Sequence, residues 1–158
     1  MATIPLTKRG VTKLKDELQQ LKGVERHAVI RAISEARAQG DLSENAEYEA
    51  AKDKQGFIEG RILEIESKLA AAQVIDPAAV DAGGRVVFGA TVDLEEEASG
   101  QKVTYQIVGD DEADLKLGLI SISSPIARAM IGKEAGDVAE VQAPGGLKHY
   151  EIVDVRYL

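Results

Sequence analysis

The sequence predicts an α+β protein, with an antiparallel coiled-coil helical hairpin followed by a small β-rich globular domain. Residues 13–37 contain no proline and consist largely of residue types that lose little free energy on entering a helix. A second segment repeats its seam positions in steps of three and four residues, as a coiled coil does. These positions are Tyr48, Ala51, Gln55, Ile58, Ile62, Ile65, Leu69 and Ala72. From Arg85 onward, apolar side chains recur at every second position, which is typical of β-strands.

The charge of the chain changes between its halves. Residues 1–75 carry 12 basic and 12 acidic side chains, whereas residues 76–158 carry 7 and 15, so the second half accounts for the net charge of −8. We therefore expect a hairpin over residues 1–76, a linker at 77–84 and a globular domain over 85–158. An acidic domain does not attract phosphate backbones by counterion release, so any role on RNA or DNA needs another means of attachment.

The composition excludes several classes of protein. The chain has no cysteine, and therefore neither a disulfide framework nor a thiolate metal site. Its two histidines, His27 and His149, are too far apart in sequence to indicate a local site. No apolar run approaches the roughly 20 residues that span a bilayer. We expect a soluble, cytoplasmic monomer without a membrane partner.

The first arm of the hairpin has recognisable start and stop signals. The hydroxyl of Thr7 can cap the free backbone N–H groups at a helix start. After Gly23 the apolar stripe loses its regular spacing, which predicts a stutter that changes the local winding. Gly40 is placed to end the helix with a positive φ, which glycine adopts at little cost. The regular part of the stripe comprises Leu14, Leu18 and Leu21.

The second arm is expected to end near Gln73, because Pro77 follows shortly after and cannot continue a helix. Alternating side chains then predict strands at 86–94, 103–107, 119–122, 138–141 and 151–155, with a polar hairpin loop at 95–100 and a turn at 144–146. One short helix is expected over 125–130. Nothing in this sheet has the pattern of a catalytic site.

The stretch between the two arms, residues 40–48, concentrates carboxylates where the chain reverses. Asp41 and Glu44 are three residues apart, so their oxygens can converge on a hard cation such as Mg²⁺ as an incomplete site. The same spacing fits a capping-box variant, with Asp at the N-cap and Glu at N3 of the second arm, which needs no metal. Spacing alone favours the capping interpretation.

The stretch Gly-Asp-Leu-Ser-Glu-Asn-Ala-Glu-Tyr at 40–48 closely resembles the GreA/GreB family of bacterial transcript-cleavage factors. The resemblance covers essentially the whole chain. Its further blocks, in the same order as in the family, are residues 4–7, 50–52, 55–62, 73–76, 87–92, 107–114, 124–128 and 144–146. It implies an FKBP-like fold for the second half and a partner, RNA polymerase, whose secondary channel admits the hairpin. Such a factor is an accessory to the polymerase and is not itself an enzyme.

The resemblance also assigns roles to residues at the tip. Asp41 and Glu44 would act as the catalytic carboxylates, completing the shell of a Mg²⁺ ion that the polymerase holds weakly, so that backtracked nascent RNA is cleaved near its 3′ end. No Mg²⁺ is expected in the free protein. Arg37 and Lys52 would contact RNA phosphates, although charge alone also fits a solvated helix face. Tyr48 could stack on a base or pack in the seam.

In the second half, Ser123, Ser124 and Pro125 match the segment that docks on the rim of the polymerase channel in this family. The same residues read as a helix start, with Ser124 as N-cap and Pro125 at N1, and both interpretations can hold together. The acidic run at 110–114 lacks the glycine and spacing of a calcium loop, so we interpret it as a solvated loop.

Three alternatives remain open from the sequence. A factor of the same shape could bind the polymerase channel and inhibit transcription, although the intact Asp41 and Glu44 argue against this. The second half could be an FKBP-like peptide-binding module or prolyl isomerase, but Phe57 and Phe88 and the absence of tryptophan leave few aromatics for a proline pocket. A coiled-coil adaptor would instead form dimers.

Overall fold

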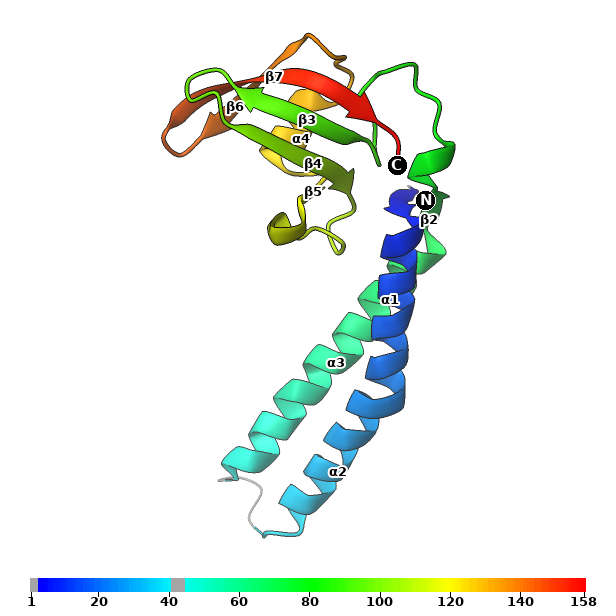
Figure 1. Ribbon diagram of the computed structural model, residues 1–158. Coiled ribbons are helices and arrows are strands. Elements are labelled where there is room, and N and C mark those ends of the chain that lie inside the picture. Colours follow the sequence, from blue (N-terminus) through cyan, green and yellow to red (C-terminus); the bar gives the residue numbers. More distant parts are fainter. Residues whose placement is uncertain (1–2, 41–44) are drawn as a thin grey trace. The chain divides into compact units, whose positions relative to one another are not determined.

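The computed structural model describes residues 3–40 and 45–158 (Figure 1). Their contacts form two compact units, and each is described by itself. The first is Thr12–Ala72, and the second combines Thr3–Val11 with Gln73–Leu158. The sequence-based boundaries placed all of residues 1–76 in the hairpin and 77–84 in a linker, whereas these contacts assign residues 3–11 and 73–84 to the β-rich unit.

Two arms build the helical hairpin (Figure 1). The first arm is continuous and consists of α1 (Lys8–Gln20), the π-helical turn η1 (Leu21–Glu25) and α2 (Arg26–Arg37). The second arm is the single helix α3 (Ala46–Ala70). The π turn lies where the sequence predicts a stutter, around Gly23, so that prediction is confirmed.

The predicted seam is confirmed by burial. On α3, Ala51, Ile58, Ile62 and Ile65 are buried, and the remaining seam positions are half-buried. On α2, Val29, Ile33 and Ala36 are buried. A cluster of Val29, Ile58 and Ile62, with Leu18 and Leu21 packed against it, forms the centre of this seam. Burial of these side chains, rather than helix propensity alone, therefore stabilises the hairpin.

The ends of the first arm match the predicted signals. The backbone N–H of Gly10 donates a hydrogen bond of 2.9 Å to Oγ1 of Thr7, which caps α1. The stretch after α2 reaches Gly40 with φ of +115°, a positive value that glycine adopts without a Cβ clash. The start at Thr7 and the positive φ of Gly40 are confirmed, but α2 already ends at Arg37, with Ala38 as its C-cap.

Two short strands were not predicted. β1 (Ile4–Thr7) precedes α1, and β2 (Ala72–Ile75) follows α3; they pair in a two-stranded sheet. Because β2 begins at Ala72, α3 ends at Ala70 rather than near Gln73. A 3₁₀ turn, η3 (Pro77–Ala79), then occupies part of the expected linker, capped by the Asp76 carboxylate, which accepts from the Ala78 N–H.

The main sheet of the second unit has five strands in the order β5-β4-β3-β7-β6. Its elements are β3 (Thr91–Glu96), β4 (Lys102–Val108), η4 (Leu115–Leu117), β5 (Leu119–Ser121), α4 (Pro125–Met130), β6 (Val138–Ala143) and β7 (Gly146–Arg156). Neighbouring strands are antiparallel except β4 and β5, which are parallel. The α+β class is confirmed, as is the helix expected at 125–130.

The predicted first strand begins later than its alternating pattern does. Val86, Phe88 and Ala90 are buried, but β3 starts only at Thr91. Gly89 has φ of +88°, which interrupts an extended strand. The alternating pattern at 86–90 therefore predicts correctly which side chains are buried, but the prediction of a strand over these residues is wrong.

One core lies against the five-stranded sheet. It contains residues from β3, β4, β6 and β7 together with Ala127 and Met130, so α4 covers this face of the sheet. Among the residues described here, no helix is long and apolar enough to cross a membrane.

Candidate functional site

The two arms approach each other at one asparagine. Asn45 is the N-cap of α3, and its Oδ1 accepts a 3.0 Å hydrogen bond from the Tyr48 N–H. Its Nδ2 donates a 2.7 Å hydrogen bond to the carbonyl oxygen of Ala36 in α2. One side chain therefore starts the second arm and ties it to the end of the first. Asn45 was not among the residues predicted to have a role at the tip, although asparagine is among the best N-cap residues.

Asp41 and Glu44, the predicted catalytic and metal-binding pair, lie outside the described residues. The capping-box interpretation can nevertheless be corrected, because it assigned the N-cap of the second arm to Asp41 and α3 is instead capped by Asn45. Asp41 is therefore not the N-cap of α3, and the capping-box interpretation that spacing alone had favoured is wrong.

Arg37 and Tyr48 meet on the two arms next to the connecting residues. The guanidinium carbon of Arg37 lies 5.9 Å from the centre of the Tyr48 ring, within the range of a cation–π interaction. Tyr48 is half-buried, so its ring both occupies a seam position and keeps some accessible surface.

Lys52 lies on α3 just beyond the first turn and is exposed, with its Nζ donating a 3.3 Å hydrogen bond to Oε1 of Gln55. Arg37 is exposed as well. Within residues 3–40 and 45–158, neither cation forms an ion pair with a carboxylate.

The serines predicted to dock the β-rich unit start α4. Ser124 is the N-cap, its Oγ accepting a 3.3 Å hydrogen bond from the Ala127 N–H, and Pro125 occupies the first turn. The helix-start interpretation is confirmed. The Ser123 hydroxyl donates to Oδ1 of Asp110 at 2.9 Å, and the Ser121 hydroxyl bonds to the same oxygen.

An apolar pocket of about 400 Å³ adjoins this helix start. Its lining includes Leu115, Leu119, Ile120, Ser124 and Ile126. Leu115 is 74% exposed and its neighbour Leu117 is 71% exposed, so large apolar side chains stand in water beside the pocket. Polar serines and an apolar pocket together form a surface of the kind that a protein partner covers.

The acidic run at 110–114 is not simply a solvated loop, as the sequence had suggested. Glu112 is only 4% exposed, and its carboxylate accepts from Nε of Arg9 at 2.8 Å and from the Thr7 hydroxyl. Asp114 caps η4 by accepting from the Lys116 N–H. The run therefore has structural roles, and its pattern gave no sign of the distant partners.

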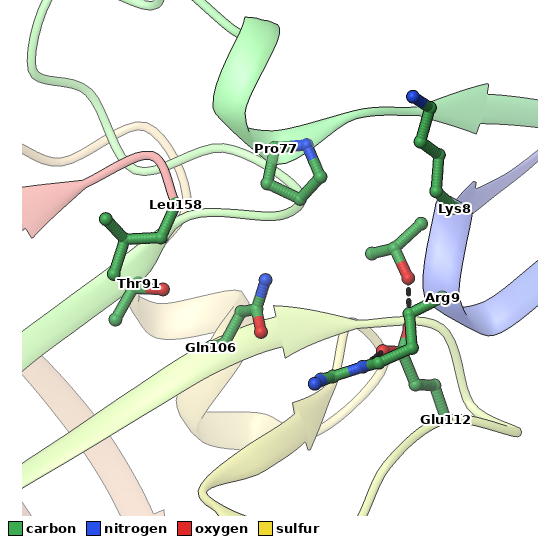
Figure 2. Close-up of a pocket in the computed structure, with 8 residues that line it drawn as sticks. Lys8, Arg9, Pro77, Thr91, Gln106, Glu112 and Leu158 are labelled. Atoms are coloured by element: carbon green, nitrogen blue, oxygen red, sulfur yellow. Dashed lines mark hydrogen bonds and ion pairs between the residues drawn. The ribbon is translucent and has the colours of Figure 1, made fainter.

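Glu112 also borders a pocket of about 360 Å³ within the β-rich unit, shown in Figure 2. Thr7, Lys8 and Arg9 contribute to its lining, together with Thr91 and Gln106. The Glu112 carboxylate already places a negative charge beside the first turn of α1, where a helix N-terminus favours one. We therefore do not interpret this pocket as a binding site for an anionic ligand. In the part of the chain that the structure describes, no group of three or more His, Cys, Asp or Glu side chains is placed to hold a metal ion.

Comparisons with known proteins agree along the whole chain. Residues 4–74 match the family described as "Transcription elongation factor, N-terminal", and residues 81–157 match "Transcription elongation factor, GreA/GreB, C-term". Transcription elongation factor GreA of Ralstonia nicotianae is 74% identical over 158 residues, covering 100% of both chains. The factor of the same name from Verminephrobacter eiseniae is 73% identical over 157 residues, covering 99% of both.

Among solved structures, GreA factor homolog 1 (Gfh1) of Thermus thermophilus is 27% identical, with 98% of this chain and 99% of that chain covered. Its TM-score of 0.43 is too low to compare how individual elements are placed. Two domain matches that together span the chain, and full-length relatives above 70% identity, show that this chain belongs to the GreA/GreB family of transcription elongation factors.

Proposed function

We propose that this protein inserts the end of its hairpin into the secondary channel of RNA polymerase, where it stimulates Mg²⁺-dependent cleavage of backtracked nascent RNA and so rescues arrested complexes. It acts in the cytoplasm as an accessory factor, and the polymerase performs the cleavage. The observation that carries the proposal is the cap at Asn45. Because Asn45 is the N-cap of α3, Asp41 does not hold the N-cap position that the capping interpretation gave it, and we propose a metal-ligand role for it and for Glu44 instead.

The donor set suits a shared cation. Two carboxylates provide hard oxygen ligands of the kind Mg²⁺ prefers, but Mg²⁺ needs six ligands in all. In this proposal Asp41 and Glu44 contribute part of the set, and the polymerase, the RNA phosphate and water contribute the rest. When bound, Mg²⁺ supplies an activated water and stabilises the oxygens of an in-line displacement at phosphorus.

The cations beside the tip have a complementary role. Arg37 and Lys52 are exposed and unpaired with described carboxylates, so each can contact a phosphate of the extruded RNA. Arg37 rests near the Tyr48 ring, which limits where its guanidinium points. Positive charges beside an acidic pair would hold the RNA while the carboxylates serve the metal.

The β-rich unit provides the second attachment. Ser123, Ser124 and Pro125 adjoin the apolar pocket with exposed Leu115, a combination that supports docking on a protein surface. This attachment addresses the problem raised by the net charge of −8, since binding to polymerase replaces electrostatic attraction to nucleic acid.

The direct test uses a stalled, backtracked elongation complex with Mg²⁺. Addition of the protein should shorten the nascent RNA, whereas the protein and Mg²⁺ without polymerase should leave labelled RNA intact. Cleavage by the factor alone, or inhibition of the polymerase without cleavage, would contradict the proposal.

Docking is tested with a matched pair of apolar surface substitutions. Leu115→Ser should weaken competition for polymerase, whereas Leu147→Ser, at a 52% exposed position on β7, should leave it near the parental value. If the two substitutions weakened competition equally, the pocket beside Leu115 would not be the docking surface.

A further inference from the structure

The first arm contains one residue more than a regular seam allows. Up to the first residue of the π turn, the seam positions Leu14, Leu18 and Leu21 are spaced by four and three residues. After it, Val29, Ile33 and Ala36 repeat the same spacing. Leu21 and Val29 are eight residues apart, one more than a heptad. The turn at Leu21–Glu25 absorbs this residue, because a π turn holds one residue more than an α-helical turn.

Of the residues in the π turn, Leu21 packs against the cluster of Val29, Ile58 and Ile62, which leaves the turn with little packing to fix its place. No residue of the turn is buried, and a Cβ added at Gly23 would meet no atom within 4 Å. If the extra residue moved toward the tip, each residue it passed would rotate by about 100° around the helix axis. The buried seam residues Val29, Ile33 and Ala36 favour the present rotation of α2, and polar contacts on either side of the turn can reinforce it.

Two bidentate ion pairs lie on either side of the turn. Before it, Arg61 of α3 donates to Glu17 through Nε at 2.7 Å and Nη2 at 2.8 Å. Directly after it, Arg26 donates to Glu59 of α3 through Nε at 2.9 Å and Nη2 at 2.8 Å. A guanidinium and a carboxylate joined by two parallel bonds fix orientation as well as distance.

Two further pairs between the arms lack this geometry. Lys22 contacts Glu66 at 3.1 Å and Lys54 contacts Glu25 at 3.9 Å, each through a single ammonium group. An ammonium is a point charge on a flexible stem, so it tolerates rotation that a bidentate pair does not. Of these four pairs, the two arginine pairs are therefore better suited to fix the rotation than the two lysine pairs.

We propose that Arg26–Glu59 and Glu17–Arg61 confine the extra residue of the first arm to the π turn between them, and so hold α2 in the rotation that places Arg37 over Tyr48. These are positioning residues, since they act on the tip through the helix. The hydrogen bonds of the pair lower the pKa of Glu59 and raise the pKa of Arg26, so the contact favours the charged form of each group.

The register is measured directly with spin labels, because the chain has no native cysteine to interfere. Ser34→Cys with Glu49→Cys places two labels at exposed sites on α2 and α3, on the tip side of the π turn. Gln19→Cys with Ser67→Cys places a control pair on the other side. The measurement is the distance distribution from electron–electron double resonance.

In Arg26→Ala, the tip-side pair should acquire a second distance differing by several ångströms, since a helix with its side chains is about 10 Å across. The control pair should not change. Lys22→Ala should leave both distances unchanged, and the exchange of charges in Arg26→Glu with Glu59→Arg should restore the single distance. An unchanged tip-side distance in Arg26→Ala, or an equal change in Lys22→Ala, would overturn the inference.

The consequence for activity rests on the proposed function. A misplaced tip in Arg26→Ala should lower stimulated RNA cleavage by about tenfold or more, with recovery in the charge-exchanged protein. Split distances with undiminished cleavage would refute the positioning role. If the parent protein stimulates no cleavage, the proposed function fails, whereas the distances still decide whether the pairs set the register.

Discussion

The guanidinium of Arg37 and the ring of Tyr48, 5.9 Å apart, join the last residue of α2 to the first turn of α3. Each side chain thereby limits the movement of the other. The contact brings a positive charge and an aromatic face to the same end of the hairpin. In the sequence, Arg37 precedes Asp41 and Glu44, and Tyr48 follows them.

Tyr48→Ala removes both the cation–π contact and part of the seam. We expect it to lower the free energy of unfolding by about 1–3 kcal/mol, because the ring is only half-buried. Tyr48→Phe keeps the ring and should differ from the parent by less than about 0.5 kcal/mol. Urea unfolding measures both. If Tyr48→Ala were as stable as the parent, the ring would not be packed in the seam.

Asn45 has two separable roles, as cap and as link between the arms. Asn45→Asp keeps an oxygen to accept from the Tyr48 N–H but loses the donor to the Ala36 carbonyl, whereas Asn45→Ala loses both. Alanine at an N-cap costs about 1 kcal/mol, so Asn45→Ala should be less stable than Asn45→Asp. Amide hydrogen exchange at Tyr48 provides the local readout. Faster exchange in both variants alike would show that the cap is not the determining contact.

Glu112 tests the structural role of the acidic run. Its carboxylate is buried and bonded to Thr7 and Arg9, so Glu112→Gln should destabilise the protein by about 1–3 kcal/mol. Glu97→Gln, which removes an exposed charge in the β3–β4 turn, is the control and should change stability by less than about 0.5 kcal/mol. Similar thermal midpoints for the two variants would contradict the role assigned to Glu112.

The Arg26–Glu59 pair predicts a pH dependence. The hydrogen bond from Arg26 lowers the pKa of Glu59 below its ordinary value of 4.5, so the folded state favours the ionised carboxylate. This contribution is fully present above pH 4.5 and is lost as the pH falls through the lower pKa of the folded state. The difference in thermal midpoint between the parent and Glu59→Gln should therefore shrink from pH 7 toward pH 3. If the difference in thermal midpoint stayed constant over this range, ionisation of Glu59 would not contribute to stability.

Much of the hairpin could be predicted because a seam leaves a periodic trace in the sequence. Ile58, Ile62 and Ile65 recur at helical spacing on α3, and the irregularity near Gly23 marks the π turn. The start of α4 was likewise visible, since the signals for a helix N-terminus are local.

The missed features depend on partners that are distant in sequence. β1 and β2 are short, and they pair across the entire hairpin. Glu112 is buried by residues more than a hundred positions away, which no local pattern reveals. The cap at Asn45, by contrast, is a local feature, since asparagine is a preferred N-cap residue. It was missed because Asp41 and Glu44 fit a competing capping pattern.

The central claim is that Asp41 supplies a metal ligand. Asparagine is a poor Mg²⁺ ligand, so Asp41→Asn should abolish stimulated cleavage in a backtracked complex while competition for polymerase stays intact. Glu47→Gln, which removes an equal charge in the first turn of α3, is the control and should retain parental cleavage. The decisive measurement is the amount of shortened RNA produced by these two variants on the same complexes. Loss in Asp41→Asn alone supports the account, and near-parental cleavage by Asp41→Asn contradicts it.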